Sequence, residues 1–243
     1  MLSKKYHLGI IVVLTTIATL MTSAAFAATE KVLHSFGNNA DGTYPIGIVF
    51  DSHGNLYGTT AFGGVYNNGT VFELAARRGG GVTEKVLHSF GNGSDGAQPF
   101  GGLLLSSQGI LVGTTSIGGA YAAGTVFALV PKTGGGWAEK ILYSFGGRPD
   151  GSGPGSGLIA DAAGNLYGIT GGGGAFGLGT VFELVRKSGG GWAEKILYSF
   201  GTSVTDGFGP AGNLIFGPGG SLFGVTSEGG QMFCTVTCGT VFQ

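Results

Sequence analysis

The chain has 243 residues, of which 53 are Gly, 42% are hydrophobic and only 10% are charged. The glycine share is about three times ordinary usage, but it lacks the strict three-residue period of collagen, and the hydrophobic content excludes a disordered chain. Because 12 basic residues face 13 acidic ones, there is no basic surplus to neutralise phosphates, and we expect no nucleic-acid partner.

Residues 1–27 have the pattern of a secretory signal peptide. Lys4 and Lys5 precede an apolar run over residues 8–20, and an A-x-A site ends at Ala27. The run is shorter than the ~20 residues that span a bilayer, so we expect cleavage after Ala27 rather than a retained membrane anchor. The sequence therefore predicts export to the periplasm, the cell surface or the medium, with no transmembrane segment in the mature chain.

A repeat of about 55 residues organises residues 28–243, which we expect to form a single domain. Each copy carries five landmarks in the same order: E-K-[VI]-L-[HY]-S-F, Asp-Gly, a proline, L-x-G and G-T-V-F. The first landmark begins at Glu30, Glu84, Glu139 and Glu194, and the Asp-Gly pairs begin at Asp41, Asp95, Asp150 and Asp206.

Each repeat contains four short segments with strand composition. In the second copy these are residues 85–90, 100–105, 110–115 and 125–130, and residues 140–145 open the next copy. The frequent glycines disfavour helices, so we expect an all-β protein. Apolar residues on both faces of the strands indicate sheets that are covered on both sides. We therefore expect a β-propeller of four four-stranded blades; a β-solenoid is the alternative.

The unit P-x-G-[IL]-x-x-D-x-x-G-N-L-Y-G-T-T-x-x-G-G followed by G-T-V-F-E-L is most complete over residues 45–74. It resembles the GloVer tandem repeat of exported bacterial proteins, and the resemblance covers about residues 30–243. The resemblance implies a bacterial surface or extracellular protein and no established catalytic activity. Nothing after the repeats resembles the sorting anchor that such proteins carry. The P-x-G core is also similar to that of NHL-type propellers, which agrees with the blade interpretation.

Four aspartates recur at one repeat position, each followed by Gly. The simplest interpretation is an Asx-turn in which the carboxylate caps backbone N–H groups and the glycine takes a positive φ. The alternative is a ring of carboxylates able to hold Ca²⁺. These residues are Asp41, Asp95, Asp150 and Asp206. Asp51 and Asp161 have no such counterpart in the other copies, and we expect them to be turn residues.

A second recurring set is apolar and lies two residues after each Gly-Gly pair: Tyr66, Tyr121, Phe176 and Met232. In a blade, the loop between the second and third strands lies on the same face as the loop that joins two blades. The simplest interpretation is that these side chains pack under their own loops. The alternative is that they form an apolar rim around the mouth of the propeller that stacks on sugar rings, with Asn67 and Asn68 offering hydrogen bonds.

No motif for catalysis or nucleotide binding is present. His34 and His88 alternate with Tyr143 and Tyr198 at one strand position, which indicates a structural position rather than a general base. We expect a non-enzymatic binding or interaction module whose partner is a polysaccharide or a surface protein. The alternative is a hydrolase or lyase with a metal at the propeller axis.

Cys234 and Cys238 lie in the short stretch CTVTC within the one irregular insert of the repeats. In an exported protein, two such neighbours are expected to form a local disulfide. Free or metal-bound thiols are the alternative, although no His or further Cys accompanies them.

The chain ends at Gln243, before a fifth copy of the strand that starts each repeat. The fourth blade therefore lacks an outer strand, and residues 31–36 are a spare strand of the right type. We expect residues 31–36 to pair with residues 240–242 and to protect that edge. Truncation from a longer repeat array, with an open last blade, is the alternative.

Overall fold

The computed structural model describes residues 30–37, 40–146, 149–203, 205–230 and 238–243. The chain divides between residues 32 and 33, and the fold described below is that of the second part, residues 33–243. The predicted signal peptide, residues 1–27, lies outside the described residues, as do Met232 and Cys234. Export, cleavage and the pairing of Cys234 with Cys238 therefore stay predictions.

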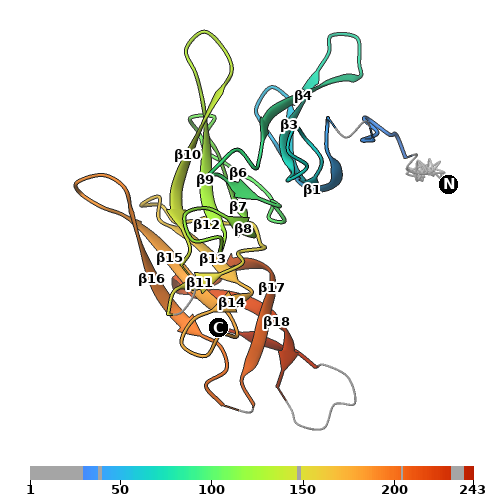
Figure 1. Ribbon diagram of the computed structural model, residues 1–243. Coiled ribbons are helices and arrows are strands. Elements are labelled where there is room, and N and C mark those ends of the chain that lie inside the picture. The colour runs from blue at the N-terminus through green and yellow to red at the C-terminus, as the bar shows by residue number, and fades with distance from the viewer. Residues whose placement is uncertain (1–29, 38–39, 147–148, 204, 231–237) are drawn as a thin grey trace, which may run out of the picture. The chain divides into compact units, whose positions relative to one another are not determined.

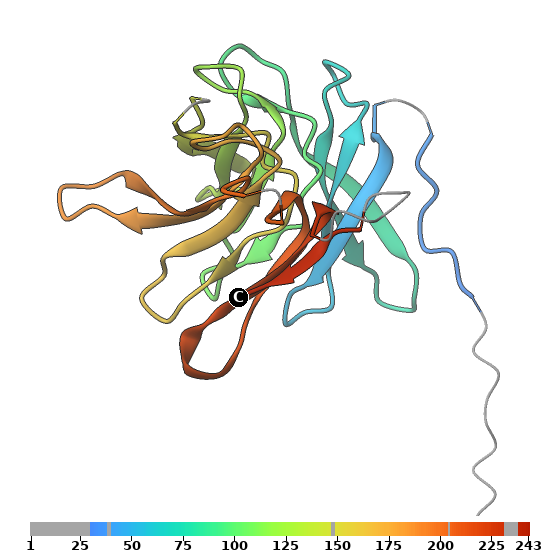
Figure 2. The ribbon, with the colours of Figure 1, turned by 90° about the horizontal axis from the view of Figure 1, so that it is seen from below.

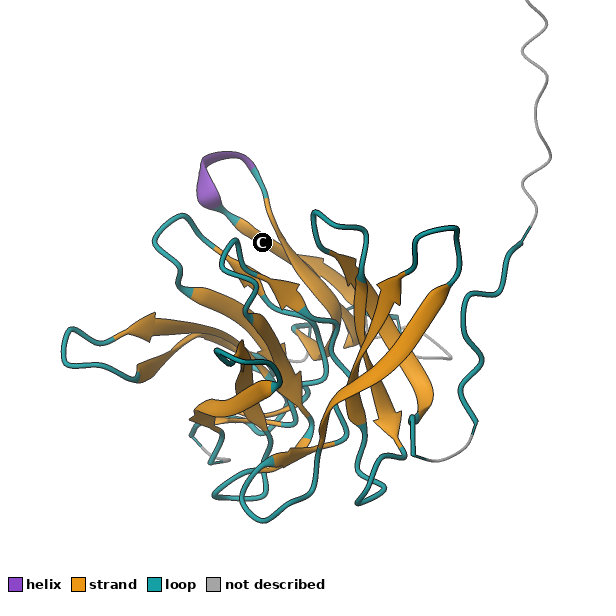
Figure 3. Ribbon diagram, turned by 90° about the horizontal axis from the view of Figure 1, so that it is seen from above, coloured by secondary structure: helices purple, strands orange, loops and turns teal. Residues whose placement is uncertain are grey.

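The described chain is built from strands, with one short 3-10 helix, η1 (Pro218–Gly220) (Figure 3). Four antiparallel sheets follow one another along the sequence, with strand orders β1-β2-β3-β4, β6-β7-β9-β10, β12-β13-β15-β16 and β17-β18-β19 (Figure 1). They are arranged as the four blades of a β-propeller (Figure 2). Among the described residues, no helix has the length and apolar character that crossing a membrane requires.

The strand bounds show how each blade is assembled from two successive repeats, because the outer strand of a blade belongs to the next copy. The first sheet contains β1 (Thr43–Phe50), β2 (Leu56–Phe62), β3 (Thr70–Ala76) and β4 (Val82–Ser89). The second contains β6 (Leu104–Leu105), β7 (Leu111–Thr115), β9 (Thr125–Pro131) and β10 (Trp137–Ser144). The third contains β12 (Ile159–Ala160), β13 (Leu166–Thr170), β15 (Thr180–Arg186) and β16 (Trp192–Ser199), and the fourth β17 (Gly207–Phe216), β18 (Leu222–Gly229) and β19 (Thr240–Phe242).

The two middle blades have a divided inner strand. Two short ladders, β5 (Gly96–Ala97) with β8 (Ile117–Gly118) and β11 (Gly151–Ser152) with β14 (Gly172–Gly173), stand apart from β6 and β12. The strand expected over residues 100–105 is therefore reduced to Leu104–Leu105. Part of the reason is that the intervening backbone bonds to the preceding blade: the Thr59 hydroxyl donates to the Gly101 carbonyl (3.3 Å).

The repeated glycines have steric explanations. Gly113 lies opposite Phe127 in the ladder, and a Cβ at Gly113 would come within 2.7 Å of the Phe127 ring. The equivalent pairs of the L-x-G and G-T-V-F landmarks are Gly58 with Phe72, Gly168 with Phe182 and Gly224 with Phe242. The two landmarks therefore recur together because the ring of one strand occupies the space above the glycine of its neighbour.

The Asp-Gly glycines correct an expectation. Of the four, only Gly42 has a positive φ, whereas Gly96, Gly151 and Gly207 do not. Each of the four instead lies against a threonine of the paired strands, where a Cβ would overlap the side chain. These threonines form hydrogen-bonded pairs with 2.8 Å between their hydroxyl oxygens: Thr60 with Thr70, Thr115 with Thr125, Thr170 with Thr180 and Thr226 with Thr240. Close approach, rather than backbone conformation, requires glycine in three of the four copies.

One aromatic contact joins each blade to the next. Fully buried Phe90, at the end of β4, meets Phe127 of the second blade edge to face, with ring centroids 5.0 Å apart. Phe145 with Phe182 and Phe200 with Phe242 repeat the contact at 5.1 Å. The final Phe of each E-K-[VI]-L-[HY]-S-F landmark therefore packs its blade against the blade that follows in sequence.

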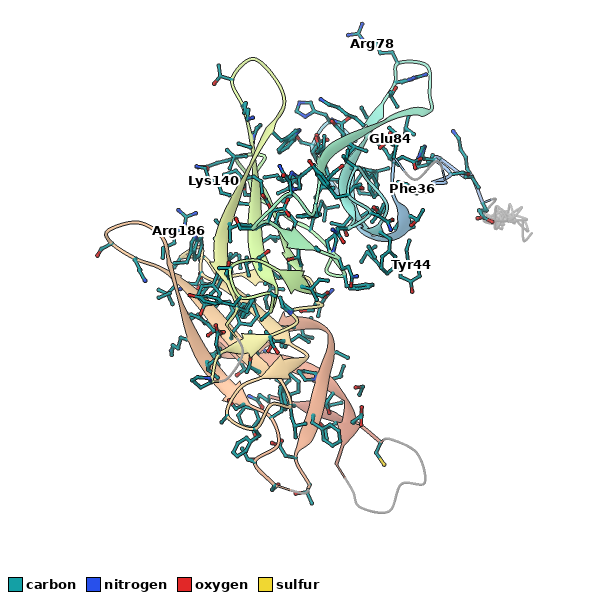
Figure 4. All side chains as sticks on the ribbon, in the orientation of Figure 1. Phe36, Tyr44, Arg78, Glu84, Lys140 and Arg186 are labelled. Carbon is teal, nitrogen blue, oxygen red and sulfur yellow. The ribbon has the colours of Figure 1, made fainter. Side chains whose placement is uncertain are left out.

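The predicted closure of the propeller by strand pairing is wrong. Residues 30–37 form no strand, and the fourth sheet contains three strands in which β19 pairs with β18. Phe36 instead packs on Phe72 of the first blade at 4.8 Å (Figure 4). The physical reason is that Phe36 makes the same contact as the Phe of every later copy, and this contact holds it on the blade that follows it. The first three blades have four strands, as expected, and the last has three.

Candidate functional site

The recurring aspartates lie in the turns that lead into each blade, and each accepts backbone hydrogen bonds. The Gly91 N–H donates to Asp95 Oδ1 (2.7 Å), and the Gly146 N–H donates to Asp150 Oδ2 (2.7 Å). Asp41 and Asp206 accept equivalent bonds from the N–H groups of Gly37 and Gly201. The carboxylates therefore cap their own turns, which accounts for the position of an aspartate in every copy.

Each of these aspartates also meets the [HY] side chain of its own repeat. His88 Nε2 lies 3.0 Å from Asp95 Oδ2, and His34 Nε2 lies 3.4 Å from Asp41 Oδ2. In the later copies a tyrosine hydroxyl donates instead, from Tyr143 to Asp150 (3.0 Å) and from Tyr198 to Asp206 (2.9 Å). The histidines are thus positioned as hydrogen-bonding partners of the turn aspartates.

A glutamate from the next copy completes three of these clusters, which we call the joint triads. They are His34–Asp41–Glu84, His88–Asp95–Glu139 and Tyr143–Asp150–Glu194. Sequence reasoning used these glutamates only as landmarks and missed their role. The signal was their recurrence in the middle of apolar strands, where a carboxylate needs a partner.

Burial raises the pKa of all three joint glutamates above the ordinary value of 4.5. The effect is largest at Glu194, where burial together with a hydrogen bond and charge repulsion from Asp150 raises the pKa to about 9. The Asp150–Glu194 pair therefore holds one proton at neutral pH, shared in the hydrogen bond between the two carboxyl groups.

The raised pKa of Glu194 makes stability depend on pH. The folded protein holds a proton that the unfolded chain releases above about pH 4.5, so the free energy of unfolding falls as pH rises from about 5 to about 9. We expect a loss of about 1–2 kcal/mol from this group, because partial exposure screens the charge. Glu194→Gln should flatten this slope in denaturant titrations at several pH values.

Glu228→Gln is the control for this experiment, because it removes a carboxylate that belongs to no joint triad. It should keep the wild-type slope. Equal slopes for wild type and Glu194→Gln would show that Glu194 is ionised in the folded protein.

The four aspartates do not gather into the carboxylate ring that was the alternative to the turn interpretation. Each lies in a turn of its own, Asp41 before the first blade and the other three between successive blades, and each accepts a backbone N–H of that turn. Among the described residues, the one group of three His, Cys, Asp or Glu side chains that gathers its ligand atoms is His88, Asp95 and Glu139. All three occupy recurring positions: His88 and Asp95 belong to the second copy, and Glu139 lies on β10 of the adjoining blade.

The predicted rim aromatics are partly exposed: Tyr66 by 46%, Tyr121 by 69% and Phe176 by 47%. Their loops contact the aspartate turns, since a Cβ at Gly91 would lie 3.0 Å from the Tyr66 Cβ and one at Gly146 would lie 3.7 Å from the Tyr121 ring. The two kinds of loop therefore share one face, as expected. Each of the three side chains is therefore partly packed and partly open to solvent.

Asn67 contributes less to this face than expected. Its side-chain oxygen accepts the N–H of Gly63 (3.2 Å) within its own loop, and its φ is 57°. Asn67 thus stabilises the loop that carries Tyr66, leaving the aromatic rings as the main exposed groups of the rim.

The opposite end of the blades carries a different recurring motif. Asp51 accepts the N–H groups of His53 (2.8 Å) and Asn55 (2.9 Å) and the hydroxyl of Tyr57 (3.2 Å). Asp161 makes the matching bonds with Asn165 and Tyr167 in the third blade. Both aspartates therefore hold the D-x-x-G-N-L-Y turn, as the sequence predicts.

A cleft of about 650 Å³ between the second and third blades was not foreseen from the sequence. Leu104, Leu142 and Leu166 are among its apolar lining residues. Lys140 and Arg186 supply positive charge from adjoining blades (Figure 4), and the Arg186 guanidinium lies 5.0 Å from the ring centre of Trp192. It forms because the inner strand of each middle blade is short.

The fold and the contacts between blades together define a tandem-repeat β-propeller. Equivalent contacts recur from blade to blade. The family model of the Gloeobacter/Verrucomicrobia repeat matches residues 15–159. The chain belongs to this repeat family, which confirms the resemblance to GloVer repeats drawn from the landmarks. No curated protein matches the chain.

Proposed function

We propose that the chain is an exported, non-enzymatic binding module that stacks the rim aromatics on the sugar rings of a polysaccharide. The observation that carries the proposal is the exposure of Tyr66, Tyr121 and Phe176 at equivalent positions of three successive blades. Planar aromatic faces in a region of low charge suit the apolar faces of sugars, and a repeated binding element suits a repeating ligand.

Two further features support this proposal. The signal-peptide pattern of residues 1–27 would deliver the chain to a compartment where polysaccharides are found. The recurring aspartates accept backbone N–H groups of their own turns, which gives them a structural role in each copy. A surface protein is the other partner that an aromatic rim would suit.

Retention of the mature protein on insoluble cellulose, chitin and cross-linked dextran tests the proposal. We expect retention on at least one of them, and the double variant Tyr66→Ala/Tyr121→Ala should weaken it by about tenfold or more, as for the loss of aromatic contacts in other interfaces. Phe50→Ala is the control, because Phe50 is 65% exposed at the opposite end of the first blade.

Two results would overturn the assignment. No retention of wild type on any of the three matrices removes the support for sugar binding. Retention that survives the double variant but is lost in Trp192→Ala would place the binding surface in the cleft between the second and third blades instead.

A further inference from the structure

The second joint triad brings three metal-ligating atoms together between the first two blades. His88 Nε2, at the end of β4, lies 3.0 Å from Asp95 Oδ2 in the connecting turn and 3.7 Å from Glu139 Oε1 on β10. All three ligand atoms lie within 4.8 Å of one another. The side chains are 20%, 7% and 15% exposed, so the group is largely shielded from solvent.

Hydrogen bonds do not satisfy every polar atom of this triad. Nε2 of His88 carries at most one proton, and Asp95 is its near partner. Glu139 Oε1 is buried and accepts no hydrogen bond. At the next joint Glu194 Oε1 is likewise buried without a hydrogen-bond partner, but Glu194 Oε2 accepts from the Tyr143 hydroxyl (3.4 Å), which also donates to Asp150 (3.0 Å). What distinguishes the second joint is therefore the imidazole of His88, whose Nε2 lies beside both carboxylates.

We propose that the His88–Asp95–Glu139 joint binds one divalent transition-metal ion of the Zn²⁺ type, through His88 Nε2, Asp95 Oδ2 and Glu139 Oε1. A mixed nitrogen and oxygen donor set favours Zn²⁺ over Ca²⁺ and Mg²⁺, which take oxygen ligands. Ligand atoms about 2.1 Å from one ion lie roughly 3–3.5 Å apart. The two spacings from His88 Nε2, 3.0 and 3.7 Å, are close to this range, and all three atoms lie within 4.8 Å of one another. The ion links the first blade to the second and leaves a coordination position for water.

We expect one bound ion per chain, because no other described joint gathers this ligand set. His34 and Asp41 repeat the motif in the first joint, but among the described residues only the His88 group brings three ligand atoms within 4.8 Å of one another. The joints of Tyr143 and Tyr198 lack the imidazole. The difference between histidine and tyrosine joints also provides control variants. The Tyr143 joint shows that a tyrosine at this position keeps the contact with the turn aspartate.

The test uses the untagged mature protein after treatment with EDTA, titrated with ZnCl₂ in a calorimeter and with CoCl₂ by visible absorption. We expect one equivalent of Zn²⁺, a higher melting temperature on binding, and Co²⁺ absorption bands of a nitrogen-containing site. His88→Tyr should remain folded, because it copies the Tyr143 joint, and should weaken Zn²⁺ binding by about a hundredfold or more.

Control variants test whether Zn²⁺ binding depends on this triad alone. His34→Tyr and His53→Ala should bind Zn²⁺ as the wild type does, because neither residue belongs to the gathered triad. The converse variant Tyr143→His, which rebuilds the triad at the next joint, should raise the stoichiometry toward two. Failure of the wild type to bind Zn²⁺, or unchanged binding by a folded His88→Tyr variant, overturns the proposal.

Discussion

Replacing Phe127 by alanine should lower the free energy of unfolding by about 4 kcal/mol, within the range for large-to-small changes at fully buried aromatic residues. Phe127 has no exposed surface, covers Gly113 on the neighbouring strand and meets the Phe90 ring of the first blade. The change therefore opens a cavity at a strand pair and at a blade joint together. Urea denaturation followed by tryptophan fluorescence measures the effect.

Two companion variants show whether the loss comes from the joint. Phe50→Ala, at a side chain that is 65% exposed, should change the stability by no more than about 0.5 kcal/mol. The double variant Phe90→Ala/Phe127→Ala should lose less than the sum of the single variants, because the two rings contact each other. Full additivity would contradict the joint contact.

Much of the fold could be predicted from the sequence, because residues that pack against each other recur at fixed positions in every repeat. The L-x-G and G-T-V-F landmarks mark adjacent strands, as Gly113 and Phe127 show by facing each other in the ladder. Their order in all four copies predicted four blades of one type. The outer strand of each blade, taken from the following copy, was also evident from the spacing.

The ends of the propeller were harder to predict, because strand composition does not say which partner a strand will meet. Residues 31–36 have the same composition as β4, yet Phe36 binds the first blade through Phe72 and leaves β19 without a fourth strand. The short inner strands of the middle blades were missed for a similar reason. Bonds such as Thr59 to Gly101 join different blades, and no local pattern encodes them.

The candidate site was predicted in part. The aspartates were correctly placed in turns, and the aromatic residues were correctly placed on loops of the same face. Glu139 and Glu194 were missed because their partners come from the preceding copy, across the packing of two sheets. The alternation of histidine with tyrosine suggested a structural position. In the structure it also distinguishes the Tyr143 joint, in which Asp150 and Glu194 share a proton, from the His88 joint, in which three potential ligand atoms lie together.

Gly124→Ala should lower the free energy of unfolding by at least about 3 kcal/mol. We expect this loss to exceed that of any other glycine-to-alanine substitution in the same blade. Gly124 has a φ of +97°, and a Cβ there would overlap the Thr115 carbonyl and lie 2.6 Å from Pro154 Cδ in the following repeat. Its own carbonyl accepts the Phe145 N–H (3.0 Å), so the backbone between the second and third blades cannot shift without losing that bond.

Gly135→Ala separates the overlap from the backbone strain. Gly135 has a similar φ of +101°, but a Cβ there would meet no atom within 4 Å. It should therefore lose only about 1–2 kcal/mol, the amount expected for a left-handed residue with a side chain. Thermal and urea denaturation of the two variants measure the difference. Equal losses would show that the left-handed conformation alone requires glycine at position 124, and that the second and third blades do not approach each other closely there.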